Sequence, residues 1–330
     1  MFEQSIYSRI LKRFLYLLLL LFASSLIAFL LVTYSPLDPI EAYIGSDKTV
    51  SPEQVENIKE YWGLNQPPAE RYIKWLRNVL HGDWGNSLIY RKPVIRIIGQ
   101  RVQASLALMI TAWLFSGLLG FALGLIAGKN EGKPADRVIR FFSYVLASMP
   151  VFWFGLLMLT VFAIRLKWFP IALAVPIGTL QEEVTLADRI HHLILPALTL
   201  SVVGSANITL HTREKLIEVR HSEYHRYAVS RGETERDFLR HHGLRNVMIP
   251  ALTLQFASFS ELFGGSVLAE QVFSYPGLGS AITAAALGGD IPLLLAVSLF
   301  SAIFVFTGNL IADVLYMVLD PRIREEGAKG

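Results

Sequence analysis

The chain has 330 residues, of which 53% are hydrophobic and 17% are charged, with a formal net charge of +3 and a mean hydropathy of +0.44. This balance is too apolar for a water-soluble domain of the same length and is typical of a protein that crosses a membrane several times. The sequence contains no Cys, which excludes disulfides, thiolate metal sites and cysteine nucleophiles.

Six apolar stretches are long enough to cross a bilayer as a helix, which takes about 20 residues. We expect these spans near residues 14–33, 102–127, 138–164, 193–210, 249–269 and 293–319. The first stretch is longer than the apolar part of a signal peptide and lacks a small-x-small cleavage site, so it is interpreted as a retained signal-anchor. The predicted fold is all-α, a polytopic membrane protein with six transmembrane helices.

The distribution of basic residues predicts the orientation of these spans. Most of the 30 Lys and Arg residues lie in segments that are cytoplasmic if the N-terminus is inside. Because cytoplasmic loops are enriched in Lys and Arg, both termini are predicted to be cytoplasmic. We expect three parts: residues 1–33 as the N-terminal segment and first transmembrane helix, 34–101 as an extracytoplasmic helical segment, and 102–330 as a five-helix transmembrane core with a cytoplasmic loop at 211–248.

The segment 34–101 contains two amphipathic helical patterns. Ser51 and Pro52 are typical of a helix start, with Gln54 completing a capping box. The second helix carries apolar residues on one face, namely Tyr72, Trp75, Leu76, Val79 and Leu80. Two interpretations stay open: the helices cover the outer ends of the bundle, or they form a platform for an external binding protein.

Two local patterns predict how the second and third spans pack. Four glycines recur every three or four residues in the second span, at Gly117, Gly120, Gly124 and Gly128. Such a small-residue face lets membrane helices approach closely. Pro150 lies near the middle of the third span, where it frees a backbone carbonyl and predicts a kink.

Residues 223–250 form the most charged stretch between apolar runs. Its arginines are spaced four or five residues apart, at Arg226, Arg231, Arg236, Arg240 and Arg245. The stretch is either a solvated basic loop that maintains topology or a contact surface for a partner. Its aromatic residues do not interleave with the basic ones as stacking platforms, so no nucleic-acid partner is predicted.

Charged residues inside membrane spans are costly and suggest function. Glu261 lies in the fifth span and Asp313 in the sixth. We hypothesise that Glu261, with Gln255, Ser258, Met149 and Asp313, lines a translocation path and meets a cationic group of the cargo. The alternatives are a carboxylate hydrogen-bonded between helices at Glu261 and a structural ion pair at Asp313.

The sequence lacks the patterns of an energy-converting or hydrolytic site. It has no G-x-x-x-x-G-K-[ST] motif and therefore no P-loop for ATP, and no H-E-x-x-H motif. We predict no catalytic residue and no metal site. A membrane chain of this kind takes its driving force from a partner or from an ion gradient.

Three motifs carry a family resemblance over nearly the full length. The charged loop contains Arg226-Tyr227-Ala228, Gly232, His242-Gly243-Leu244-Arg245-Asn246 and Pro250. The outer segment contains Gly82-Asp83-Trp84-Gly85-Asn86-Ser87. Residues 264–279 read GGSVLAEQVFSYPGLG, the most specific of the three. Together they resemble the peptide/nickel family of binding-protein-dependent ABC importer permeases.

This resemblance implies the architecture of a type I ABC importer transmembrane domain in the bacterial cytoplasmic (inner) membrane. It implies a permease subunit, not an enzyme, that imports peptides or a small metal chelate such as nickel. The expected partners are a second homologous permease subunit, ABC ATPase subunits, an extracytoplasmic solute-binding protein and the lipid bilayer. The chain itself is expected to bind no cofactor, with ATP and Mg held by the ATPase subunits.

The resemblance also implies residue roles. The ATPase-coupling residues are Arg226, Tyr227, Ala228, Gly232, Asp237, Leu244, Arg245, Asn246 and Pro250. Ala228 would supply a small contact face and Gly232 a break between short helices, while Arg226 would contact the ATPase or cap the loop. The outer residues that would meet the binding protein are Asp83, Trp84, Glu270, Pro276 and Gly277.

One alternative function belongs to another class. A stand-alone ion-coupled secondary transporter would also be polytopic and would lack an ATP site. Inverted repeats with paired broken helices would favour it, but the two halves of this sequence show no internal similarity.

Overall fold

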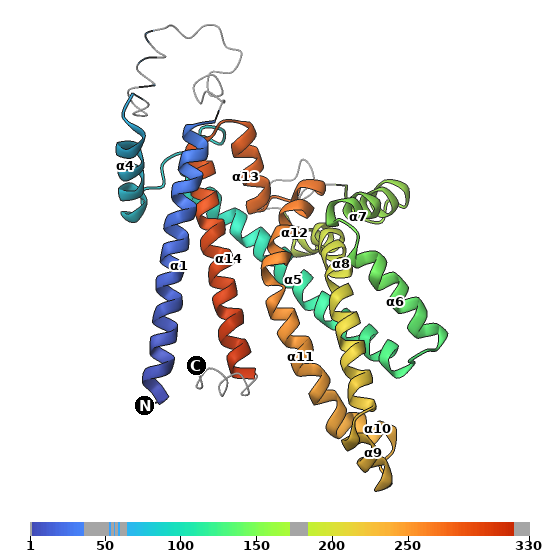
Figure 1. Ribbon diagram of the computed structural model, residues 1–330. Coiled ribbons are helices and arrows are strands. Elements are labelled where there is room, and N and C mark those ends of the chain that lie inside the picture. Colours follow the sequence, from blue (N-terminus) through green and yellow to red (C-terminus); the bar gives the residue numbers. More distant parts are fainter. Residues whose placement is uncertain are drawn as a thin grey trace. The chain divides into compact units, whose positions relative to one another are not determined.

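The computed structural model describes the backbone of residues 2–35, 53, 56, 59, 65–171 and 184–319 (Figure 1). Side chains are described for the same residues except 2–13, 235 and 312–319. The regular secondary structure of the described residues is helical, and their only strand-like pairing is an isolated bridge between Asn86 and Pro93. The all-α prediction is therefore confirmed.

Four described helices are long and apolar enough to cross a membrane. They cover Phe14–Thr33 within α1 (Phe2–Thr33), α5 (Val94–Lys129), α8 (Leu186–Arg220) and Ile291–Ile311 within α14 (Ile291–Leu319). Two bent pairs pass the same test together, so that up to six spans result if each pair is one span. Each of the six predicted spans coincides with one of these helices or pairs.

The chain divides into two compact units. Unit 1 contains residues 1–103 and 277–307, and unit 2 contains residues 104–276 and 308–330. Unit 1 holds α1, α4 (Pro68–Leu80), the first part of α5, α13 (Leu278–Leu287) and the first part of α14. The remaining described helices belong to unit 2.

In unit 1, α4 packs along the C-terminal half of α1 (Figure 1). The Tyr72 ring lies 5.3 Å from that of Phe29, and its hydroxyl shares a hydrogen bond of 2.8 Å with the Ser25 Oγ. Leu295 of α14 completes this buried cluster. The predicted apolar face of α4 is confirmed except at its last member, because Leu80 is 77% exposed.

The earlier amphipathic pattern of segment 34–101 falls mostly outside the described residues. Ser51, Pro52 and Gln54 are among those not described, while Glu53, Glu56 and Lys59 are helical.

The third predicted span is two helices rather than one kinked helix. α6 (Pro134–Ala147) ends before Ser148, α7 (Val151–Met158) begins after Pro150, and a π-helical turn, η1 (Leu159–Arg165), continues it. The bend between the two parts is 110°. Because Pro150 lacks an N–H and stands in an extended conformation (φ −61°, ψ 133°), it starts a new helix instead of bending the old one.

The fifth predicted span also differs from expectation. α10 (Glu235–Phe238), the π-helical turn η2 (Leu239–Gly243) and α11 (Leu244–Ala257) form one continuous helical run, with Pro250 inside it. Pro250 therefore lies inside a helix and does not mark the end of the charged stretch. The chain bends by 52° at Ser258, where α12 (Phe259–Val272) begins.

The glycines of α5 allow close contact with α8 in unit 2. A Cβ at Gly124 would lie 2.5 Å from the Thr212 Cβ and 2.8 Å from the Thr209 carbonyl oxygen. Similar distances occur at Gly120, which faces Ile208 and the Ser205 carbonyl. Two backbones meet here, so neither side can yield as a flexible side chain would, and the predicted small-residue face is confirmed as a packing feature.

We predict that Gly124→Ala lowers the stability of the protein by about 1–3 kcal/mol, the usual cost of overpacking a rigid contact. Gly264→Ala is the matched control, because a Cβ there would meet nothing within 4 Å in the described structure. Thermal unfolding of the two variants in the same detergent checks this. Equal midpoints for both variants would contradict the close contact.

Candidate functional site

The charged loop folds as two short helices joined by a tight turn. Ser222 caps α9 (Glu223–Ser230) by accepting from the His225 N–H at 3.4 Å. Thr234 caps α10 by accepting from the Asp237 N–H at 3.3 Å. Gly232 lies between the two helices with a φ of +88°, a conformation that favours glycine. The predicted break at Gly232 agrees with this turn, and Asp237 has a local capping contact.

A small apolar core holds these helices to the ends of α8 and α11. Ala228 of α9 and Phe238 of α10 are buried together with Val247 of α11 and with Leu216 and Val219 of α8. Ala228 is only 6% exposed, so it packs inside the loop and cannot supply the contact face expected of it. Its small size instead lets α9 lie close to the neighbouring helices.

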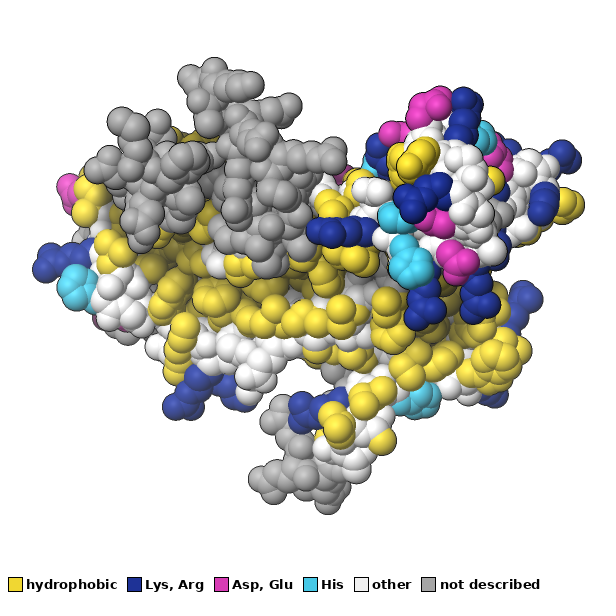
Figure 2. Space-filling model, turned by 90° about the horizontal axis from the view of Figure 1, so that it is seen from below, with side chains coloured by type: hydrophobic (Ala, Val, Ile, Leu, Met, Phe, Trp, Pro, Cys, Tyr) yellow, Lys and Arg dark blue, Asp and Glu magenta, His cyan; other side chains and the backbone are white. Residues whose placement is uncertain are grey.

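Outside this core, α9 presents exposed aromatic and basic side chains. Tyr227 is 63% exposed, and the Arg231 guanidinium lies 5.9 Å from its ring centre. Arg226 pairs with Glu223 of the same helix at 2.9 Å, an exposed pair of little energetic weight. Figure 2 shows basic, acidic and histidine side chains gathered over α9 and α10, at the upper right. This surface is available to a partner.

The last predicted coupling residues lie on α11. Leu244, Arg245 and Asn246 are exposed. Asn246 donates to the His242 carbonyl at 3.1 Å and to the Tyr224 hydroxyl at 3.4 Å, which joins α11 to α9. Pro250 lies farther along the helix.

Sequence reasoning missed an ion pair beside this loop. Asp136 of α6 is fully buried and accepts two hydrogen bonds from Arg213 of α8, at 2.5 Å from Nε and 2.9 Å from Nη2. The Gly132 N–H donates to the same carboxylate at 2.9 Å. Asp136 and Arg213 are 77 positions apart in sequence, so no local pattern could have indicated this ion pair.

Arg220, at the same end of α8, makes a second polar contact with a neighbouring helix. Its Nη1 donates to the carbonyl of Gly128 at 2.9 Å, in the last turn of α5. The positive charge of Arg220 thus lies at the C-terminal end of α5, where the helix dipole is negative, and this arrangement is favourable.

A cavity of about 420 Å³ lies in unit 2 where both bent pairs break. Met149 and Val151 come from the first break, and Ser258 and Glu261 from the second. Asn207 lines it from α8. The structure thus brings together three of the predicted path residues, Met149, Ser258 and Glu261, although Met149 lies far from the other two in sequence.

Glu261 is exposed in this chain, and no ion pair to it occurs among the described residues. The neighbouring Ser260 hydroxyl donates to the Asn309 Oδ1 at 2.8 Å. An unpaired carboxylate in an apolar helix needs water, a partner or a ligand nearby.

The other two predicted path residues are placed differently. Gln255 is buried and does not line the cavity; its Nε2 donates to the Trp113 carbonyl at 2.6 Å. The Gln255 side chain therefore joins α11 to α5. Asp313 belongs to α14, and its side chain lies outside the described residues.

In unit 1, the segment after α4 is held by Asp290, a residue that sequence reasoning also missed. The fully buried Asp290 carboxylate accepts from the Ser87 hydroxyl, from the Ile89 N–H at 3.1 Å and from the Leu293 N–H at 3.1 Å. It thereby caps α14 and anchors the segment that carries Asp83 and Trp84. Asp83 is exposed, and its Oδ1 accepts from the Gly85 N–H at 3.0 Å.

The predicted outer residues of unit 2 are less accessible. Glu270 is fully buried and accepts from the Ser105 hydroxyl at 2.6 Å. It therefore does not lie at the surface, where a contact with the binding protein was expected. Burial is the main cause that raises the pKa of Tyr275 to about 12, and the nearby negative charge of Glu270 adds to it. The Tyr275 hydroxyl therefore stays neutral. Pro276 is half-buried. Gly277, which opens the second stretch of unit 1, is buried.

Among the described residues, no group of three or more His, Asp or Glu side chains could hold a metal ion. The described arrangement offers an exposed charged surface on α9 and α10, a cavity that contains the carboxylate of Glu261, and an anchored segment after α4.

Two family models match the sequence. Residues 120–325 match the binding-protein-dependent transport system inner membrane component, and residues 6–109 match the N-terminal membrane component of such systems. Together these matches cover most of the chain.

Curated relatives agree with the family models. The chain is 35% identical over 315 residues to the oligopeptide transport system permease protein AppB of Bacillus subtilis (strain 168), covering 95% of this chain and 98% of that protein. It is 35% identical over 297 residues to the probable peptide ABC transporter permease protein y4tP of Sinorhizobium fredii, covering 90% and 92%. It is 34% identical over 316 residues to the glutathione transport system permease protein GsiC of Escherichia coli (strain K12), covering 96% and 98%. The chain therefore belongs to the binding-protein-dependent ABC importer permeases of the peptide family, as an integral membrane subunit.

Proposed function

We propose that the chain is a six-span permease subunit that imports peptides across the bacterial inner membrane, with both termini in the cytoplasm. It works with a second permease of the same kind, with ABC ATPase subunits that hold ATP and Mg, and with an external solute-binding protein. The observation that carries this proposal is the charged loop, because its core fixes two helices rigidly while leaving basic and aromatic side chains exposed for a partner.

The same two helices carry the loop and line the cavity. α8 contributes Asn207 and Ile208 to the cavity and continues without a break to Arg220. α11 contributes Leu254 and Ala257 to the cavity and begins at the loop. A displacement of α9 by a partner ATPase is therefore transmitted along rigid elements to the walls of the cavity.

The loop residues divide into two roles. Arg226 and Tyr227, with Leu244, Arg245 and Asn246, face outward and would touch the ATPase. Ala228, Gly232 and Asp237 hold the shape of the loop, through burial, a left-handed turn and a helix cap respectively.

The cavity offers one carboxylate to a passing cargo. Peptides carry an N-terminal ammonium group that Glu261 could attract, with Asn207 and Ser258 as hydrogen-bonding neighbours. Two of the relatives are named as peptide permeases and one as a glutathione permease, which favours a peptide over a metal chelate.

Purification of the tagged chain from its native membrane in mild detergent tests the proposed complex. Mass spectrometry should identify a second permease and ATPase subunits, and ATP hydrolysis should rise when peptide-loaded binding protein is added. A chain that purifies alone and whose uptake follows a proton or sodium gradient would indicate the secondary transporter instead. Stimulation by a nickel chelate but not by peptides would change the cargo and leave the class intact.

We predict that Gly232→Asp abolishes ATP-driven uptake while the chain remains in the membrane. A Cβ at this position would meet no atom within 4 Å in the described structure, so the expected cost is that of the left-handed backbone, about 1–2 kcal/mol. Gly232→Asn is the control for charge, because Asn, like Asp, can adopt this conformation but is neutral. Equal loss in both variants would assign the effect to the backbone rather than to the charge, and normal uptake in Gly232→Asp would contradict the prediction.

We predict that Glu261→Gln lowers peptide uptake about tenfold, the effect of losing about 1.4 kcal/mol of attraction to an ammonium group. The complex should assemble normally, because no ion pair of Glu261 occurs among the described residues. Glu70→Gln removes an exposed carboxylate of α4 and serves as the control. The role in the path is wrong if uptake in Glu261→Gln equals that of the control.

A further inference from the structure

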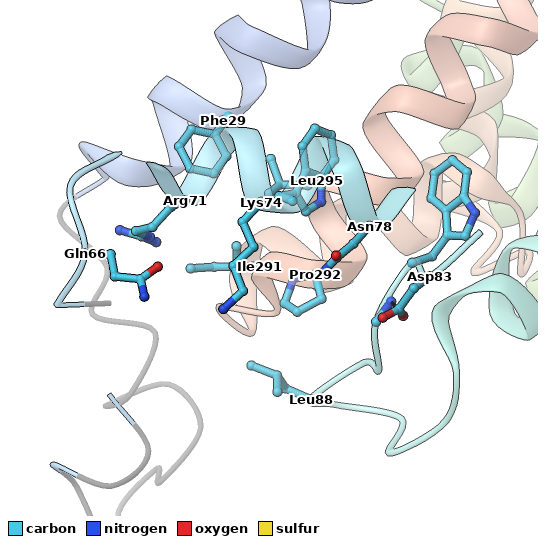
Figure 3. A pocket seen from close by; sticks show the side chains of 13 residues that line it. Phe29, Gln66, Arg71, Lys74, Asn78, Asp83, Leu88, Ile291, Pro292 and Leu295 are labelled. Carbon is cyan, nitrogen blue, oxygen red and sulfur yellow. Dashed lines mark hydrogen bonds between the residues drawn. The ribbon is translucent and has the colours of Figure 1, made fainter. Parts of the chain in front are cut away.

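Unit 1 contains a pocket of about 270 Å³, and its lining includes Asp83 and Trp84, which are expected to meet the solute-binding protein (Figure 3). It lies between α4, the C-terminal end of α1 and the start of α14. Phe29, Ile291 and Leu295 form part of an apolar wall. Arg71 and Lys74 of α4 also line it, and Figure 3 shows the Arg71 guanidinium beside Gln66 and the end of Lys74 lower in the view, below Ile291.

The two cations have no anionic partner in the described part of the chain. No ion pair of Arg71 or Lys74 occurs there, and the Arg71 guanidinium lies over the Phe29 ring, 5.8 Å from its centre. Partial burial lowers the pKa of Arg71, because the charge has lost water without gaining an anion. The one carboxylate in the lining, Asp83, accepts from the Gly85 N–H. The pocket therefore has an excess of positive charge.

The pocket lies level with the C-terminal end of α1 and the N-terminal end of α14. Phe29 is one turn from the end of α1 at Thr33, and Ile291 is the first residue of α14. Trp75 and Trp84 both line the pocket, and tryptophan is enriched at membrane–water boundaries. This combination is typical of the boundary between lipid tails and headgroups.

The neighbouring surfaces are apolar and exposed. Only 11% of the apolar window of α1 is buried inside the structure, and Leu31 is 69% exposed. On α4, Ile73 is 65% exposed. Lipid tails would cover such surfaces and would reach the pocket from the side.

We propose that this pocket binds the phosphate headgroup of an anionic phospholipid. Arg71 and Lys74 donate to the phosphate oxygens, Gln66 and Asn78 are neutral donors at its rim, and the first part of an acyl chain lies on Phe29 and Leu295. Arginine matches phosphate geometry well, and a lysine adds a point charge. A small soluble anion would use the cations but would leave the apolar wall uncovered, so the amphipathic lining favours a lipid.

Native mass spectrometry of the complete transporter tests this site. The complex is placed in nanodiscs of equal parts phosphatidylglycerol and phosphatidylcholine, and the lipids that remain bound are counted. The parent should retain phosphatidylglycerol preferentially. In Arg71→Gln and in Lys74→Gln the occupancy of one such lipid should fall about tenfold, the effect expected from losing one charge-assisted hydrogen bond.

Arg77→Gln is the matched control, because Arg77 is an exposed cation of the same helix that does not line the pocket. It should retain the lipid, and Arg71→Lys should retain part of it. Equal loss in Arg77→Gln would mean diffuse attraction and would overturn the site. Displacement by inorganic phosphate would assign the pocket to free anions, and displacement by the solute-binding protein would assign it to an acidic side chain of that protein. The counts do not depend on transport, so the site can fail while the proposed function stands.

Discussion

The close contact between α5 and α8 is the constraint on which the rest of unit 2 depends. Glycine at Gly120 and Gly124 lets the two backbones meet, and in lipid such packing replaces the hydrophobic effect as the force between helices. The buried pair of Asp136 and Arg213 then ties α6 to α8 near the loop. A buried pair of this kind is weak evidence for stability, because its desolvation is costly, but losing either partner would leave an uncompensated charge. The pair therefore specifies how α6 and α8 fit together.

Both helix breaks contribute to one cavity, which has a physical reason. A break leaves backbone groups without helical partners, and the interior of a bilayer cannot hydrogen-bond them. Such breaks are tolerated where protein or a water-filled space satisfies the groups. The break at Pro150 and the bend at Ser258 meet at the cavity that also holds Glu261. The free-energy cost of the irregular backbone and that of the Glu261 carboxylate in an apolar helix thus both arise at this cavity.

The charged loop separates its mechanical part from its contact part. Ala228 and Phe238 are buried and hold the shape, while Tyr227 and the arginines stay exposed. Unit 1 shows a comparable division, since Asp290 is buried and anchors the segment on which Asp83 is exposed. In both units, buried side chains whose structural role the sequence did not indicate hold in place the exposed residues that the sequence analysis singled out.

Local patterns in the sequence were sufficient for the helical class, the positions of the long apolar helices, the apolar face of α4, the glycine face of α5 and the family. Each of these depends on composition, periodicity or spacing within a short window, which the chain carries without reference to its fold. Tertiary structure was needed to show that Ala228 and Glu270 are buried, that Gln255 binds the backbone carbonyl of Trp113 instead of lining the cavity, and that Pro150 restarts a helix whereas Pro250 does not. It was also needed to pair Asp136 with Arg213. Burial and long-range pairing depend on which distant segments meet, and that information does not lie in any one stretch of sequence.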